Sequence, residues 1–157
     1  MFVRDRITQL DSRLGASNKV IIGGGLVGAE LAEFMAERGR EVSVFEEGPV
    51  LAKDMSHPRR WRVLHDLRDA GVVLHAETEV TAIGADTLEF RSLGSETNVQ
   101  SLPVDTVIIA TGLVANPEGV EALRSAGLPL VVIGDANGTA YLDGAIEQGF
   151  MAAIDLG

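Results

Sequence analysis

One glycine-rich segment constrains the fold of this chain more than any other feature. Residues 23–28 read Gly-Gly-Gly-Leu-Val-Gly, which satisfies the spacing G-x-G-x-x-G. In this pattern Gly23 permits a tight turn and Gly25 lets the backbone approach a pyrophosphate, while Gly28 lets the next helix pack closely on the preceding strand. The loop predicted to bind a dinucleotide therefore consists of Gly23, Gly24, Gly25, Leu26, Val27 and Gly28.

The residues on both sides of this loop meet the conditions that a dinucleotide-binding loop requires. Residues 20–22 are a continuous β-branched run, as in a buried parallel strand, and a helical pattern follows over residues 26–38. About twenty residues after the loop, Glu46 ends a second strand, where an acid accepts hydrogen bonds from the ribose hydroxyls. A glycine-rich turn that binds no nucleotide is the alternative reading.

Two acidic residues at the end of the second strand predict which nicotinamide dinucleotide is bound. Glu46 is followed directly by Glu47, and no arginine lies in the turn that begins there. A 2′-phosphate would meet like charges at this point, and repulsion between them is relieved only by an intervening cation. We therefore expect NAD(H) rather than NADP(H). Arg59 and Arg60, at the start of the next helix, are read as a solvated pair and, as the alternative, as partners of the pyrophosphate.

The rest of the chain alternates between strands and helices in the manner of a parallel α/β sheet. A helix is expected to follow Ser56, with Trp61, Leu64 and Leu67 along one face. Three short alternating segments, 79–83, 87–91 and 97–102, then predict an antiparallel meander. The remaining expected elements are an arm or helix over 1–18, strands over 72–74, 107–109 and 130–133, and helices over 118–126 and 144–154. The predicted fold class is α/β, a three-layer Rossmann-like fold whose parallel sheet carries a β-meander crossover.

Composition excludes several other classes of protein. A formal charge of −10 repels phosphate backbones, so we expect no nucleic-acid partner. The sequence has no cysteine, which removes disulfides, thiol nucleophiles and iron–sulfur ligands. The charged N-terminus lacks the apolar core of a signal peptide, and no run is long enough to span a bilayer, so a cytoplasmic protein with no membrane contact is expected. His57, His65 and His75 are widely spaced, and we predict no metal site and no catalytic residue.

An ordered set of segments carries a resemblance to a known family. It comprises residues 20–46, the meander, 105–112, 131–135 and the closing segment 142–150. Together these resemble the two-dinucleotide-binding-domain flavoproteins. They are most similar to the C-terminal region of the NADH:flavin oxidoreductases related to 2,4-dienoyl-CoA reductase and trimethylamine dehydrogenase.

This resemblance implies that two parts of the chain bind different cofactors. Residues 19–112 would form an NAD(H)-binding domain that ends at Thr111 and Gly112. Residues 113–157 would return to complete an FAD-binding domain, with Gly134 and Asp135 at the ribityl–phosphate part of the flavin. FAD would be shared with an N-terminal half that is missing here, as are the flavin and substrate domains, so the chain is expected to be a fragment or excised module.

The function implied is that of a dinucleotide-binding module in an FAD/NAD(H)-dependent oxidoreductase, with hydride transfer between nicotinamide and flavin in the full-length enzyme. Such chemistry needs binding and orientation from the protein rather than a nucleophile. The alternative is a structural or interaction domain that keeps the fold without a working cofactor.

Overall fold

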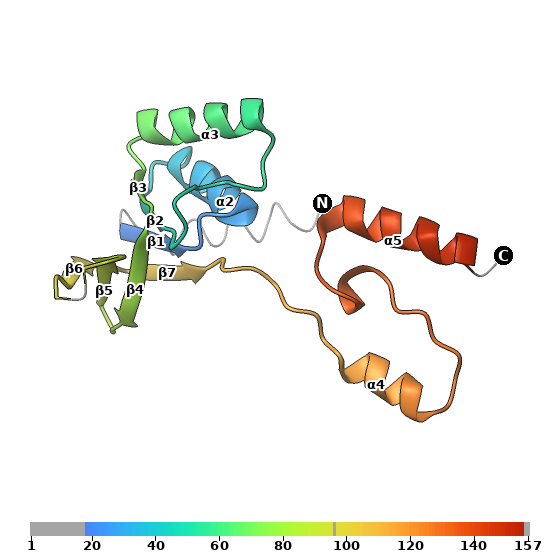
Figure 1. Ribbon diagram of the computed structural model, residues 1–157. Helices are drawn as coiled ribbons and strands as arrows, with labels where there is room; N and C mark the ends of the chain where they lie inside the picture. Colours follow the sequence, from blue (N-terminus) through green and yellow to red (C-terminus); the bar gives the residue numbers. More distant parts are fainter. Residues whose placement is uncertain (1–17, 96, 156–157) are drawn as a thin grey trace. The chain divides into compact units, whose positions relative to one another are not determined.

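The computed structural model describes residues 18–95 and 97–155, and the chain divides into two compact units, 1–111 and 112–157. The first unit is built on a parallel sheet with the strand order β3-β2-β1-β7 (Figure 1). Its strands are β1 (Asn18–Ile22), β2 (Glu41–Phe45), β3 (Val73–His75) and β7 (Thr106–Ile109). The central strand β1 places Ile21 opposite Val44 of β2 and Ile108 of β7.

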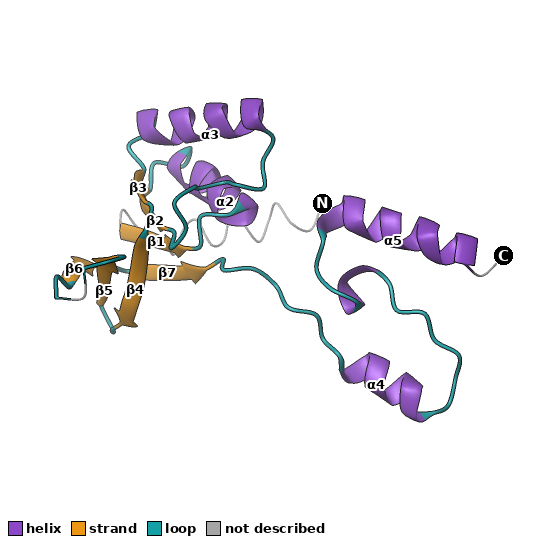
Figure 2. Ribbon diagram, viewed as in Figure 1, coloured by secondary structure: helices purple, strands orange, loops and turns teal. Residues whose placement is uncertain are grey.

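Two helices cover one face of this sheet and an antiparallel meander covers the other (Figures 1 and 2). The helices are α2 (Leu26–Ala36) and α3 (His57–Asp69); the meander is β4 (Thr78–Ile83), β5 (Thr87–Ser92) and β6 (Gln100–Pro103). Because side chains alternate along a strand, Ile21 packs toward the helices and Val20 toward the meander. The predicted three-layer α/β fold with a meander crossover is confirmed.

Helix α3 packs through part of the face that the sequence predicted and leaves the rest exposed. Val63 and Leu67 are buried in the core, whereas Trp61 is 71% exposed. Ser56 does precede the helix, but its side chain makes no capping hydrogen bond. Leu64 and Leu67 of the predicted face do pack against the core, whereas Trp61 does not. Residues 63 and 67 are one turn apart, and this pair rather than the largest apolar side chain meets α2 and the sheet.

The second unit contains α4 (Glu118–Ser125), a short 3-10 turn η1 (Gly134–Ala136) and α5 (Tyr141–Asp155). The strand expected over residues 130–133 is absent, so that prediction is wrong. A strand forms only where a neighbour pairs with its backbone, and no strand lies among residues 112–155. The expected N-terminal arm falls almost wholly on residues 1–17, outside the described residues. Among the described residues, no helix is both long enough and apolar enough to cross a membrane.

The layer between sheet and meander holds a histidine among aromatic rings. The His75 ring stacks on Phe45 with 4.3 Å between centroids and 4° between planes, and its centroid lies 5.4 Å from that of Phe90. Burial lowers the pKa of His75 below its ordinary value of 6.5, because desolvation disfavours the charged imidazolium. The folded chain therefore keeps His75 neutral at pH values where the unfolded chain has bound a proton.

This difference predicts that acidification weakens the fold through His75. Between pH 6.5 and the lower pKa of the folded state the unfolded chain binds more protons, so the free energy of unfolding falls as the pH is lowered through that range. His75→Phe keeps an aromatic ring at this position and is expected to lose less stability between about pH 7.5 and about pH 5.5. Urea unfolding at the two pH values measures the effect. The exposed His57 provides the control variant, His57→Gln, which should behave as the unmodified chain does; an equal loss in His75→Phe would contradict the assignment.

Candidate functional site

A cavity of about 220 Å³ opens at the carboxyl ends of the parallel strands. It is lined by Ile22, Gly23, Phe45, Glu46, Glu47, Thr78, Val80 and Thr111. Ligands of open α/β sheets bind at this edge, because the loops that leave adjacent parallel strands meet there. Four of the predicted site residues, namely Gly23, Glu46, Glu47 and Thr111, come together around this cavity although 88 positions separate the first from the last.

Two glycines of the loop are required by the packing of its own backbone. Gly23 has φ +102°, and a Cβ there would overlap the carbonyl oxygen of Ala110. The Gly23 N–H donates to the Phe45 carbonyl over 2.8 Å, which ties the loop to β2. A Cβ at Gly28 would overlap the Gly23 carbonyl oxygen. Helix α2 therefore approaches the loop more closely than any residue with a side chain would allow.

Gly25 differs from the other loop glycines because its outer side is open. It is the N-cap of α2, its backbone is extended, and the nearest atom to a Cβ there would be Asp54 Oδ2 at 3.8 Å. Leu26 and Val27 begin the helix, and Val27 is 60% exposed. The first N–H groups of a helix have no intrahelical acceptor, and together with the helix dipole they favour an anion. The loop thus offers a backbone surface on the side where Gly25 lacks a Cβ.

The Glu46 carboxylate joins the glycine loop to the turn after β2. Its Oε2 accepts a hydrogen bond of 2.8 Å from the Gly24 N–H, and its Oε1 accepts one of 2.8 Å from the Gly48 N–H. The carbonyl of Gly24 accepts in turn from the Ala52 N–H over 2.6 Å. Both polar groups of the Gly24 backbone are thereby engaged by the segment that follows β2.

Sequence reasoning missed the part of the cavity contributed by the meander. Thr78 and Val80 lie at the start of β4, and Thr78 is 5% exposed with its hydroxyl donating to the Ala76 carbonyl. It also missed Ala52, which is fully buried and has φ +51°. The alternating pattern of β4 predicted a strand, but nothing in it showed that the strand begins beside Glu46.

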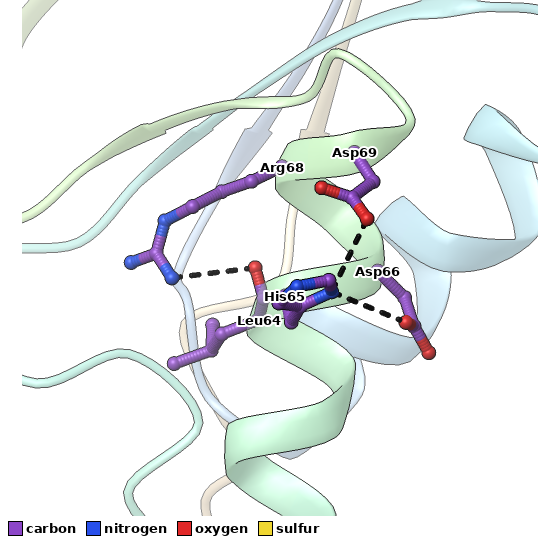
Figure 3. Close-up of polar contacts among 5 residues, drawn as sticks. All are labelled: Leu64, His65, Asp66, Arg68 and Asp69. Atoms are coloured by element: carbon purple, nitrogen blue, oxygen red, sulfur yellow. Dashed lines mark hydrogen bonds and ion pairs between the residues drawn. The ribbon is translucent and has the colours of Figure 1, made fainter.

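The charged residues of α3 make pairs on the surface. Arg59 Nη2 lies 3.0 Å from Glu30 Oε1 of α2, with both side chains about half exposed. The Nδ1 atom of His65 lies 3.2 Å from Asp69 Oδ2, one helical turn away, and 3.7 Å from Asp66 Oδ1 (Figure 3). Among the described residues no group of three or more histidine and carboxylate side chains is arranged to hold a metal ion.

The other predicted site residues lie in the second unit. Gly112 has φ +109° with open space where a Cβ would lie, and Gly134 has φ +63° at the start of η1. The Gly134 N–H donates to Gln148 Oε1 of α5 over 2.9 Å, which fixes η1 against that helix. Asp135 is exposed, and its side chain makes no hydrogen bond with another described residue.

The family follows from a match over most of the sequence. Residues 3–143 match the model of the pyridine nucleotide-disulphide oxidoreductase family. The chain belongs to this family. Relatives that match it are named as reductases and oxidases, so this is a domain of the oxidoreductase class.

Individual relatives agree with this assignment. The chain is 38% identical over 141 residues to bilirubin reductase of Mediterraneibacter gnavus, covering 89% of this chain and 22% of the relative. It is 31% identical to NADH oxidase of Thermoanaerobacter brockii, covering 85% and 20%. The structure superimposes on 2-naphthoyl-CoA reductase in complex with 2-naphthoyl-CoA with a TM-score of 0.75 and 25% identity, over 92% of this chain and 22% of that one. The chain spans about a fifth of the length of these proteins.

The contrast between Gly28 and Gly25 gives a test of the loop geometry. Gly28→Ala places a Cβ against a backbone oxygen that cannot move without shifting the loop, and it should lower the free energy of unfolding by about 1–3 kcal/mol. Gly25→Ala, the matched control, adds the same atom in open space and should change it by less than about 0.5 kcal/mol. Chemical denaturation of both variants measures the difference. Equal stability of the two would contradict the close approach of α2.

Proposed function

We propose that this chain is the NAD(H)-binding module of an NADH:flavin oxidoreductase of the 2,4-dienoyl-CoA reductase and trimethylamine dehydrogenase type. The observation that carries the proposal is the glycine loop, which is closed by packing at Gly23 and Gly28, open at Gly25, and adjoined by a cavity rimmed with acids. The bound nicotinamide supplies hydride exchange with a flavin. The chain supplies binding, orientation and electrostatics.

Each part of the site has a role in this proposal. The backbone N–H groups at Gly25, Leu26 and Val27 would hold the pyrophosphate at the start of α2. The cavity beside the loop would take the adenosine half, with the apolar side chains of Phe45 and Val80 against the base. Because the sequence contains no cysteine, no thiol of this chain takes part in the redox step.

The acids at the cavity favour NAD(H) over NADP(H). Glu46 and Glu47 both line the cavity, and Arg59, which is not among the lining residues, is paired with Glu30 on α2. A 2′-phosphate in this cavity would meet carboxylates without a cation beside it. We therefore propose a preference for NADH of about tenfold, equivalent to about 1.4 kcal/mol.

The second unit is proposed to complete an FAD site together with flavin and substrate domains outside this chain. Gly134 and Asp135 would face the ribityl–phosphate part of the flavin. An exposed row of apolar side chains on helix α5, spaced four residues apart, is the observation that favours contact with a further domain. These are Leu142, Ile146, Phe150 and Ile154, which are 77%, 63%, 64% and 58% exposed.

The proposed function predicts that the loop, and specifically its open side, binds the nucleotide. In calorimetric titration of the chain, NADH and ADP should both bind. Gly25→Val places a branched side chain in the open space that the pyrophosphate would occupy and should abolish binding of both, while the chain remains folded. Gly119→Ala, within α4 and with open space where its Cβ would lie, serves as a control outside the loop. Unchanged NADH affinity in a folded Gly25→Val variant would refute the proposal, and no binding by the unmodified chain would favour a structural domain instead.

The proposed sharing of the FAD site predicts that the chain alone binds little FAD, although it binds NADH. The sequence has a single G-x-G-x-x-G loop, and the second unit contributes no strand among residues 112–155 that could carry another. The purified chain should therefore be colourless or contain much less than one FAD per molecule, as measured by absorbance near the flavin band. Adding the flavin domains in trans should restore FAD binding, and Asp135→Ala should weaken the restored binding. A stoichiometric yellow protein from this chain alone would contradict the proposed sharing of the site.

A further inference from the structure

The outer face of helix α3 carries an exposed tryptophan among charges of both signs. Val63 and Leu67 bury the opposite side of this helix in the core, whereas Trp61 is 71% exposed. Tryptophan is highly buried on average, and it is among the residues that contribute most to protein–protein binding. We propose that the outer face of α3 is an interaction surface through which two copies of this chain associate as an antiparallel, two-fold symmetric pair.

A cation and an anion lie along the middle of this outer face. Because successive helix positions are about 100° apart, Arg62, His65 and Asp69 fall in one strip opposite the buried side. Asp69 Oδ2 lies 3.2 Å from His65 Nδ1, and both side chains are more than half exposed (Figure 3). Arg62 is also exposed, and in the part of the chain that the structure describes its guanidinium makes no hydrogen bond or ion pair. The strip therefore presents a guanidinium two helical turns before a carboxylate.

The order of charges along α3 is the reverse of the order that stabilises an isolated helix. Its first two turns contain Arg59, Arg60 and Arg62 and no acid, whereas its last four residues are Asp-Leu-Arg-Asp. The helix dipole favours anions near the N-terminus and cations near the C-terminus. A second copy of α3 in the antiparallel direction brings the acidic end of each helix beside the cationic end of the other. The same arrangement also opposes the two helix dipoles favourably.

The spacing along the helix makes the strip complementary to itself. A two-fold axis that crosses α3 midway between His65 and Asp66 leaves Arg62 and Asp69 each about 5 Å along the helix from that axis, on opposite sides. Arg62 of each copy then lies level with Asp69 of the other. Because the interface is isologous, this contact occurs twice. Trp61 adjoins Arg62 in the sequence and would be covered by the facing copy.

The charge of the whole chain favours a second copy over an extended polyanion. Four arginines and two aspartates give α3 a formal charge of +2, which leaves −12 on the rest of a chain whose total is −10. Two copies therefore repel each other less through α3 than through their acidic remainders. At physiological salt, exposed charges more than about 8 Å apart are largely screened, so the contacts on α3 itself dominate. A nucleic acid or an anionic membrane would extend beyond α3 and be repelled by the acidic remainder.

The test measures self-association of the whole chain by sedimentation velocity. Trp61 serves as an internal probe because the sequence contains one tryptophan, and its emission should move to longer wavelength on dilution as the indole returns to solvent. Arg62→Asp and Asp69→Arg each place like charges opposite one another in both contacts and should weaken association at least about tenfold. Arg124→Asp makes the same charge change as Arg62→Asp on the exposed surface of α4, and it should alter association by less than about twofold.

Mixing the two α3 variants tests the pairing itself. An equimolar mixture of Arg62→Asp and Asp69→Arg again places opposite charges in both contacts, so it should associate to within about threefold of the unmodified chain. Circular dichroism of each variant verifies that these exposed substitutions leave the fold intact. A mixture that stays monomeric, or association that neither single substitution weakens, would overturn the inference, as would an unmodified chain that is monomeric at every concentration. Because no nucleotide is present, the outcome is independent of the proposed function.

Discussion

The arrangement of the first unit depends on a single close approach, that of α2 to the glycine loop. The Gly23 carbonyl oxygen occupies the space that a side chain at residue 28 would need. This contact allows the start of α2 to lie directly over the carboxyl end of β1, with Ala29 and Ala32 buried behind it. Small residues along that side of the helix let helix and sheet share a tightly packed core.

The close approach of α2 to the glycine loop also determines which surface of the loop stays accessible. Because the loop is packed inward at Gly23 and Gly28, its remaining free surface is the outer side of Gly25 and the first turn of α2. The segment after β2 then fixes the loop from the other direction through Glu46 and Ala52. In the proposed function, an extended anionic ligand would be held there almost entirely by backbone N–H groups.

The two faces of the parallel sheet pack against different kinds of side chain. The helical face is aliphatic and carries the loop, whereas the meander face brings Phe45, Phe90 and His75 together beneath the cavity. Phe45 belongs to both the aromatic cluster and the cavity lining, so the floor of the site is held by the packing between the layers. The meander is accordingly part of the site, because β4 contributes Thr78 and Val80 to its wall.

The sequence by itself determined the local features of this protein: the strand–loop–helix around residues 20–36, the acid that ends β2, the meander, and hence the three-layer class of fold. Each follows from periodicity or from a glycine spacing that few conformations satisfy. Only the tertiary structure decided which contacts these features make. The buried face of α3 fell on Val63 and Leu67 and not on Trp61, and residues 130–133 formed no strand because pairing requires a neighbour. Likewise, the sequence does not distinguish the two neighbouring glutamates, Glu46 and Glu47. In the structure the Glu46 carboxylate lies between the Gly24 and Gly48 amides, whereas Glu47 is exposed to solvent. Burial and hydrogen bonding differ because they depend on segments brought together from distant parts of the chain.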